Sequence, residues 1–376
     1  MIPYGHQFID KNDIKEVIKV LKSDWLTQGP MVLGFEKALA EYCGAKYAVA
    51  VCNGTAALHL AYLAAGLKPD DEVITTPNSF AATANMLLAI KARPIFCDIR
   101  LDTYNIDEEK IERLINNLPA GRQEKLKAIV PVHFAGQPCE MVKIRKIAGK
   151  YKLLVIEDAC HAIGAKYKED KIGGCQYSDM AVFSFHPVKS ITTGEGGAIL
   201  TNSKKYHEEL ISLRSHGIHK DKNGKNIMTE LGYNYRLTDI QAALGISQLK
   251  KLDKFIKARH QVVEWYKKEL KGIKGIILPK ELSGNYSGWH IYVIRTKKAE
   301  DRDKLAKYLK ERGVGVNFHY PAIYSHPFYG KNGYKNFRLE SEENYQNTCI
   351  TLPCYTKLKQ ADVKYISDKI KEYFKT

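Results

Sequence analysis

The chain has 376 residues, of which 44% are hydrophobic and 27% charged, a balance typical of a globular protein with a large core. Lysine and arginine total 58 against 42 acidic residues, giving a net charge of +16, but the lysines are dispersed among acidic neighbours. Dispersed charge is typical of a solvated surface, so nucleic-acid binding remains only a minor alternative. The sequence has no apolar run of membrane-spanning length, and the segment MIPYGHQFIDKND is too polar for a secretory signal. We therefore expect a cytoplasmic protein without a membrane partner.

The 8 cysteines are scattered through apolar segments, and none forms a CxxC pair. This spacing gives no support to a metal site. We expect reduced thiols in the core. The cysteines are Cys43, Cys52, Cys97, Cys139, Cys160, Cys175, Cys349 and Cys354.

The first two-thirds of the chain alternates short apolar runs with helical patterns, which predicts an α/β domain with a mostly parallel, seven-stranded sheet. Helices are expected between strands, for example over Asp107–Asn117 and Cys139–Tyr151. In such sheets ligands bind at the carboxyl ends of the strands. The predicted strands are Tyr47–Cys52, Glu72–Thr76, Arg93–Asp98, Lys127–His133, Leu153–Asp158, Met180–Phe185 and Gly197–Thr201.

The remainder of the chain predicts a smaller α+β domain joined by one long helix. That helix is expected from Thr238 to Leu270, with Thr238 or Asp239 as its cap. Strands at Trp289–Arg295 and Val314–His319 and helices at Asp301–Arg312 and Ala361–Tyr373 would follow. We expect residues 1–245 to form an N-terminal arm and the large domain, and residues 246–376 the linking helix and the small domain.

The first candidate site is the turn NGTAAL, at residues 53–58, between an apolar strand and an alanine-rich helix. Free amides and the positive end of the helix dipole make such a turn suitable for a phosphate, and Thr55 adds a hydroxyl. A turn of small residues that packs a helix closely on a sheet would have the same sequence. This motif alone therefore does not decide between phosphate binding and packing.

The second candidate is LLVIEDACH, at residues 153–161, where Glu157 and Asp158 end a buried strand. A buried acid needs a partner, because an isolated charge there costs several kcal/mol. Asp158 could cap the next turn, and His161 could be a hydrogen-bonded core histidine. Alternatively, Asp158 pairs with the protonated ring nitrogen of a heterocycle, and His161 lies near a phenolic oxygen.

The third candidate is Lys189, in the segment AVFSFHPVKSITTGEGG. A lysine among apolar residues and glycines at a strand end is partly desolvated, which lowers its pKa and makes the amine a nucleophile able to form an imine. Most lysines are surface charges. A surface position would not explain why Lys189 is flanked by apolar strands and a glycine-rich segment.

Together the three segments supply what pyridoxal 5′-phosphate (PLP) requires. A helix terminus can hold the phosphate, a carboxylate can keep the pyridine nitrogen protonated, and a lysine can form the Schiff base. The same lysine could then move the substrate's α-proton between Cα and C4′, acting as general acid and base. The sequence therefore predicts a PLP-dependent transaminase whose cofactor passes through the pyridoxamine form.

The motifs NGTAAL, EDACHAIGA, VFSFHPVKSITTGEGG, RSHG and GYNYRLTDIQAALG, in this order, resemble the DegT/StrS family of sugar-nucleotide aminotransferases. The resemblance extends from WLTQGPMVLGFEKAL to NFHYPAIY. It implies the type I aminotransferase fold and a homodimer with shared active sites. One subset of the family catalyses dehydration and has histidine in place of the lysine, so Lys189 argues for amino transfer.

The resemblance also implies a role for each matching residue. Lys189 would form the Schiff base, Asp158 would pair with the pyridine nitrogen, and His161 would lie beside the O3′ oxygen. Phe80 would stack on the ring, where some relatives have tryptophan. The phosphate would be held by Thr55, Ala56, Ser184 and the neighbouring subunit's Asn234.

Within this family, TPNSFAATANMLL, SFHPVKSITT and NFHYPAIYSHPFY are most similar to enzymes of pseudaminic acid biosynthesis. That similarity implies transfer of an amino group from glutamate to C4 of a UDP-linked 4-keto-6-deoxy-N-acetylhexosamine. Enzymes acting on lipid A arabinose, perosamine or 3-keto sugars share most cofactor residues, and a PLP-binding regulator without turnover is a further alternative. The candidate sugar contacts, each of which could instead serve packing or surface roles, are Tyr4, His186, His319 and Tyr320.

Overall fold

The computed structural model describes residues 1–375, and its large domain is built on a seven-stranded sheet. The strand order is β1-β9-β8-β5-β4-β2-β3, in which β9 is antiparallel to both neighbours and the other adjacent pairs are parallel. Each of the seven strands predicted for this sheet is present, which confirms the mostly parallel sheet. The strands are β1 (Tyr47–Val51), β2 (Glu72–Thr75), β3 (Arg93–Phe96), β4 (Leu126–Val130), β5 (Leu154–Asp158), β8 (Met180–Ser184) and β9 (Gly197–Thr201).

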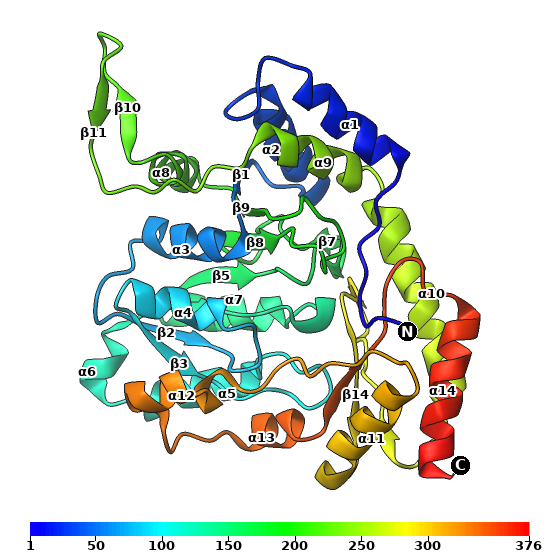
Figure 1. Ribbon diagram of the computed structural model, residues 1–376. Coiled ribbons are helices and arrows are strands. Elements are labelled where there is room, and N and C mark those ends of the chain that lie inside the picture. The colour runs from blue at the N-terminus through cyan, green and yellow to red at the C-terminus, as the bar shows by residue number, and fades with distance from the viewer. Residues whose placement is uncertain (376) are drawn as a thin grey trace.

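Helices cover both faces of this sheet (Figure 1). Alternate residues of a strand point to opposite faces, so Val49 and Val51 pack with one layer while Ala48 and Ala50 pack with the other. The first layer contains α3 (Gly54–Ala64), α4 (Ala82–Ala89) and α8 (Lys204–Arg214). The second contains α2 (Pro30–Cys43), α5 (Glu108–Asn117), α7 (Met141–Lys150) and α9 (Asp239–Leu249).

A smaller antiparallel sheet lies beside the large one, near both chain ends in Figure 1. Its strands are β12 (Ile276–Ile277), β14 (Tyr292–Thr296) and β15 (Cys349–Leu352), packed with α10 (Leu252–Leu270), α11 (Ala299–Glu311) and α14 (Gln360–Phe374). From this part of the chain, residues 322–339 return to pack on Phe96 of the large sheet. The domain boundary at residue 245 stays a prediction.

The prediction of one long helix over Thr238–Leu270 is wrong. Thr238 caps α9 as expected, but the backbone of Lys251 has φ −106° and ψ −3°, and a second helix begins after it. The two helices have different partners, since α9 packs on α1 (Lys11–Leu21) and α2 while α10 packs on α14. The ammonium of Lys251 is bound by Asp13 at 2.6 Å.

The predicted strand Val314–His319 is also absent from the described residues. Val314 forms only an isolated bridge with Ile2, and Asn317 one with Thr351. The N-terminal arm explains this difference, because Ile2 donates its amide to Gly313 and accepts from Gly315. The arm thereby takes the hydrogen bonds that a longer strand would need.

A hairpin of β10 (Ile218–Lys220) and β11 (Asn226–Met228) projects from the body of the molecule (Figure 1). It carries the exposed apolar side chains of Ile218, Ile227 and Met228. None of the helices described over residues 1–375 is long and apolar enough to cross a membrane. The remaining elements used below are β6 (Lys166–Tyr167), β7 (Asp170–Lys171), α12 (Pro327–Tyr329) and α13 (Glu340–Gln346).

Candidate active site

Lys189 lies in the turn that follows β8, where its amide donates to the carbonyl of His186 at 2.9 Å. The side chain is only partly exposed, and burial lowers the pKa of its amine although Cys160 and Asp158 act in the opposite direction. A lysine with a lowered pKa has more of its amine in the neutral, nucleophilic form. Lys189 therefore has the environment predicted for it.

Asp158, the last residue of β5, is buried with its carboxylate held by neutral donors. The hydroxyl of Thr83 donates to Oδ2 at 2.7 Å, and the amide of Cys160 donates to Oδ1 at 3.2 Å. Thr83 lies on α4 and is itself 2.7 Å from the hydroxyl of Ser79. Its donors in the described chain fix the carboxylate without neutralising it, so Asp158 can still pair with a cationic ring nitrogen.

The turn before α3 is pressed against the end of β8. Asn53 caps the helix by accepting the amide of Ala56 at 2.8 Å. A Cβ atom at Gly54 would lie 2.8 Å from Cβ and 3.2 Å from Oγ of Ser184, so only glycine allows this approach. The helix terminus and the Ser184 hydroxyl thus form a cradle suited to a phosphate, with Thr55 in its first turn. The Asn53 side chain already accepts the Ala56 amide, so a bound phosphate would have to accept from the same amide.

His161 and Tyr320 form one wall of the site, close enough to Lys189 for its charge to act on His161. The amide of Ala135 donates to Nδ1 of His161 at 3.3 Å, which places the proton of the neutral ring on Nε2, 3.3 Å from the Tyr320 hydroxyl. Burial and then the charge of Lys189 hold the pKa of His161 well below its usual value, so the ring is neutral. Phe80 lies beside this pair, with its ring 6.2 Å from that of Tyr320 and its side chain exposed.

Three of the four predicted sugar contacts gather at this wall. The ring of Tyr4 is 5.5 Å from that of His319, whose Nδ1 is 2.8 Å from the hydroxyl of Thr351. Burial, then the charge of Lys189, lowers the pKa of His319 to about 4, so this imidazole is uncharged at neutral pH. His186 is exposed instead, 4.0 Å from the carboxylate of Glu195.

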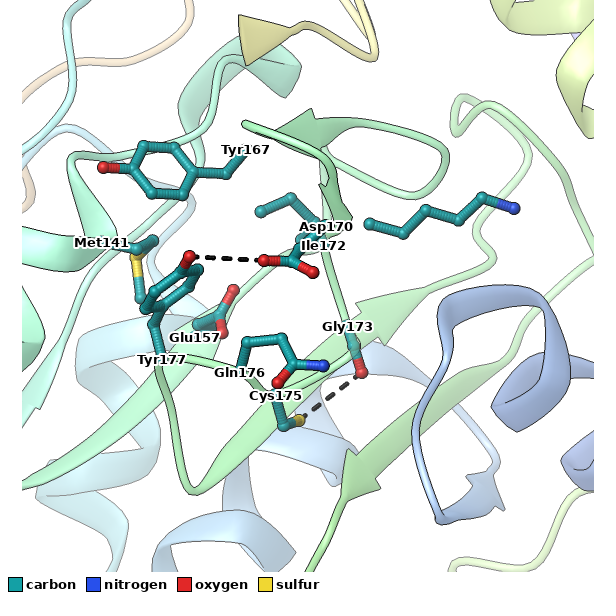
Figure 2. A pocket seen from close by; sticks show the side chains of 10 residues that line it. Met141, Glu157, Tyr167, Asp170, Ile172, Gly173, Cys175, Gln176 and Tyr177 are labelled. Atoms are coloured by element: carbon teal, nitrogen blue, oxygen red, sulfur yellow. Dashed lines mark hydrogen bonds between the residues drawn. The ribbon is translucent and has the colours of Figure 1, made fainter. Parts of the chain in front are cut away.

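Glu157 precedes Asp158 but faces the other side of the sheet. Its carboxylate accepts from Ser178 and lies 2.7 Å from Nε2 of the buried His133. Figure 2 shows Glu157 lining a small pocket with Met141 and residues of β7. The pocket holds about 10 Å³, at the lower limit for one water molecule. Glu157 therefore belongs to a buried hydrogen-bond network away from the active site, which separates the two acids that are adjacent in the sequence.

Asn234 is exposed, and its backbone bridges Ser215 within its own chain. The sequence also missed the roles of Thr83, Ser79 and the buried His290, whose ring lies 4.4 Å from that of His161. Thr83 follows Phe80 by three residues. This spacing could have indicated a side chain near the cofactor only after Phe80 had been assigned to stack on its ring. Among the described residues, no group of His, Cys, Asp and Glu suits a metal ion.

A sequence model of the DegT/DnrJ/EryC1/StrS aminotransferase family matches residues 7–371. The chain belongs to this family. It is 41% identical over 373 residues to the UDP-4-amino-4,6-dideoxy-N-acetyl-beta-L-altrosamine transaminase of Campylobacter jejuni, covering 98% of this chain and 96% of the relative. It is 37% identical to the spore coat polysaccharide biosynthesis protein SpsC of Bacillus subtilis, covering 100% and 97%.

The fold agrees with this membership. The structure of Helicobacter pylori PseC, an aminotransferase involved in the biosynthesis of pseudoaminic acid, superposes with a TM-score of 0.93 at 34% identity, covering 100% of this chain and 99% of PseC. The PLP form of the sugar aminotransferase Spr1654 from Streptococcus pneumoniae superposes with a TM-score of 0.92 at 27% identity, covering 100% and 98%. The family match and these superpositions confirm the predictions of the type I fold and of a PLP-dependent aminotransferase, and the cradle at Gly54, Asp158 and Lys189 suits that cofactor.

Proposed function

We propose that this enzyme transfers an amino group from glutamate to C4 of UDP-4-keto-6-deoxy-N-acetylhexosamine in pseudaminic acid biosynthesis. The observation that carries the proposal is the wall of neutral groups formed by His161, His319 and Tyr320 beside the amine of Lys189. Neutral hydrogen-bonding groups suit the hydroxyl and carbonyl oxygens of a sugar. The names of the Campylobacter and Helicobacter relatives support the same sugar.

Each residue has a distinct task in this reaction. When bound, PLP supplies an aldehyde that accepts the amino group and a ring that withdraws electrons. Asp158, oriented by Thr83, would hold the protonated ring nitrogen of the cofactor, and His161, whose Nε2 carries the ring proton, would serve as a hydrogen-bond donor beside its O3′ oxygen. Lys189 would hold the cofactor through its amine, and the same amine would serve as the general acid and base that moves the substrate proton.

The proposal is tested by product analysis with a panel of nucleotide-linked keto sugars and glutamate as donor. We expect amination of the UDP-linked 4-keto sugar and a weaker reaction with TDP- or GDP-linked 4-keto sugars. The Lys189→Ala variant is the matched control, and its turnover should fall by roughly 10³-fold or more because it lacks the proton-transferring amine. If the native protein aminates none of these sugars, the proposed substrate class is wrong.

We also propose that the enzyme works as a homodimer in which the partner subunit's Asn234 completes the phosphate site. Two features support this arrangement. Asn234 is exposed on its own chain, and the hairpin β10–β11 carries the exposed apolar side chains of Ile218, Ile227 and Met228. Exposed apolar side chains of this kind are typical of surfaces that a partner covers.

A further inference from the structure

Residues 233–236 form an extended segment that is attached to the strand end leading into the phosphate cradle. On one side of the segment, the amide of Tyr235 donates to the carbonyl of Arg214 at 3.1 Å. On the other side, the carbonyl of Tyr235 accepts the amide of Cys52 at 2.8 Å. Cys52 immediately precedes Asn53, the cap of α3, so the segment and the cradle share one support.

The side chains of this segment divide between its two faces. The rings of Tyr233 and Tyr235 are stacked, with their centroids 5.0 Å apart and their planes inclined by 16°. Because successive side chains of an extended chain point to opposite faces, Asn234 projects away from the two rings. Its side chain is exposed there. The stacked tyrosines therefore set the direction in which the amide of Asn234 points.

One histidine of α3 contacts both tyrosines. The ring of His59 lies 4.9 Å from that of Tyr233 and 5.9 Å from that of Tyr235, and its Nδ1 is 3.2 Å from the Tyr235 hydroxyl. His59 is itself buried. Burial lowers the pKa of His59 and raises the pKa of Tyr235, so at neutral pH a neutral ring faces a protonated hydroxyl. The hydroxyl can then donate to Nδ1.

The helix α3 connects this contact with the cradle. His59 follows Thr55 by four residues, so the two side chains lie on the same face of the helix, about 6 Å apart along its axis. The first turn of α3 forms the cradle of its own subunit. One turn later, the same helix holds the segment that carries Asn234.

We propose that His59 is a positioning residue for Asn234 of its own chain, and thereby for the phosphate site of the neighbouring subunit, an inference that rests on the proposed homodimer. His59 accepts from the Tyr235 hydroxyl and packs on the stacked rings, which fixes the backbone from which Asn234 projects. A group already held in its bound direction loses less conformational entropy when the ligand binds. Each α3 thus contributes to two phosphate sites, through its N-terminus to its own and through His59 to its neighbour's.

The experiment measures the dissociation constants of PLP and pyridoxal with the full-length apoenzyme by absorbance. His59→Leu removes the acceptor and Tyr235→Phe removes the donor, and each should weaken PLP binding by roughly five- to tenfold. Pyridoxal, which lacks the phosphate, should bind both variants as it binds the native enzyme. His59→Asn keeps an acceptor near the position of Nδ1 and should bind PLP within about twofold of the native value.

A matched control is available at the other end of β1. The ring of His207 stacks on that of Tyr47, with the centroids 4.5 Å apart, so this pair resembles the contact of His59 with the tyrosines. Since Tyr47 begins β1, His207 is remote from the cradle that follows the strand. His207→Leu should therefore bind PLP and pyridoxal as the native enzyme does.

A double variant separates a positioning role from a purely structural one. Asn234→Ala alone should weaken PLP binding by roughly tenfold or more, because a hydrogen bond to a charged group is lost. Adding His59→Leu should then cause no further loss, since two changes that act through one contact are not additive. A further loss in this background would mean that His59 acts through the cradle of its own helix, and would overturn the proposal.

Native PLP affinity in both His59→Leu and Tyr235→Phe, or an equal loss for PLP and pyridoxal, would also overturn it. Failure of the proposed shared site gives a different result. In that case Asn234→Ala alone leaves PLP affinity unchanged, and the role of Asn234 falls together with that of His59. If Asn234→Ala weakens PLP binding while His59→Leu does not, the shared site is retained and only the positioning role of His59 is lost.

Discussion

Two consecutive carboxylates at the end of β5 have opposite surroundings. Glu157 lies against the imidazole of His133 and the hydroxyl of Ser178, on the face away from the active site. Asp158 receives only neutral donors, from Thr83 and the amide of Cys160. The alternation of a strand separates the two side chains, and their neighbours then assign one to packing and the other to chemistry. Thr83 is therefore the residue through which α4 acts on Asp158.

Replacing Thr83 with valine removes the hydroxyl that orients Asp158 while nearly preserving the side-chain volume. A hydrogen bond to a charged group contributes about 1.5–3 kcal/mol, so we expect PLP to bind at least roughly tenfold more weakly. Titration of the apoenzyme with PLP, followed by absorbance, measures this change. Thr83→Ser retains the hydroxyl and should bind PLP nearly as the native enzyme does. Equal affinities of the valine and serine variants would show that the hydroxyl has no such role.

At the scale of elements, the first turn of α13 (Glu340–Gln346) is bound by a carboxylate that follows strand β3 of the large sheet. The carboxylate of Asp98 accepts the amides of Ser341 and Glu342 at 3.1 and 3.0 Å. Within the described residues, neither carboxylate oxygen of the fully buried Glu342 has a hydrogen-bond partner. Burial, and then the charges of Asp98 and Glu343, raises the pKa of Glu342 well above its usual value. Glu342 consequently keeps its proton to higher pH in the folded protein than in the unfolded chain.

This assignment predicts how stability depends on pH. A raised folded pKa means that the contribution of Glu342 is fully present below its unfolded pKa, about 4.3, and is lost as pH rises through the folded pKa. Glu342→Gln resembles the protonated side chain and removes this loss. Its advantage over the native protein should therefore increase from pH 5 to pH 7, by up to about 1.4 kcal/mol per pH unit. Urea unfolding at several pH values measures it, and a difference independent of pH would contradict the assignment.

The elements differ in how well the sequence predicts them. The seven strands were predictable because apolar runs bounded by turns identify buried strands locally. The division between α9 and α10 was not, because the apolar pattern continues through Lys251 and the two helices separate only by packing on different partners. The same limit applies to the site. Lys189 and Asp158 lie at the ends of strands, whereas Thr83 and the His161–Tyr320 pair depend on contacts between distant segments.

On the scale of the whole molecule, the proposed dimer needs surfaces that this chain leaves exposed. Asn234 is exposed, and the hairpin β10–β11, which carries the exposed side chains of Ile218, Ile227 and Met228, extends away from the body (Figure 1). Exposed apolar side chains of this kind are typical of surfaces that a partner covers. We expect these segments to contact the neighbouring subunit in the proposed dimer, so that assembly and catalysis are coupled.

Mixing two inactive variants tests whether the sites are shared. Lys189→Ala removes the proton-transferring amine, and Asn234→Ala removes the proposed phosphate contact to the neighbouring site. In a mixed dimer, one site carries both changes, and the other combines a native Lys189 with the partner subunit's native Asn234. Refolding the two variants together should therefore restore activity, up to roughly a quarter of the native value per total protein for random pairing of equal amounts into two-site dimers. The amount restored should follow the fraction of mixed dimers isolated with two different affinity tags. Lack of restoration in the isolated mixed dimer would mean that Asn234 acts within its own subunit.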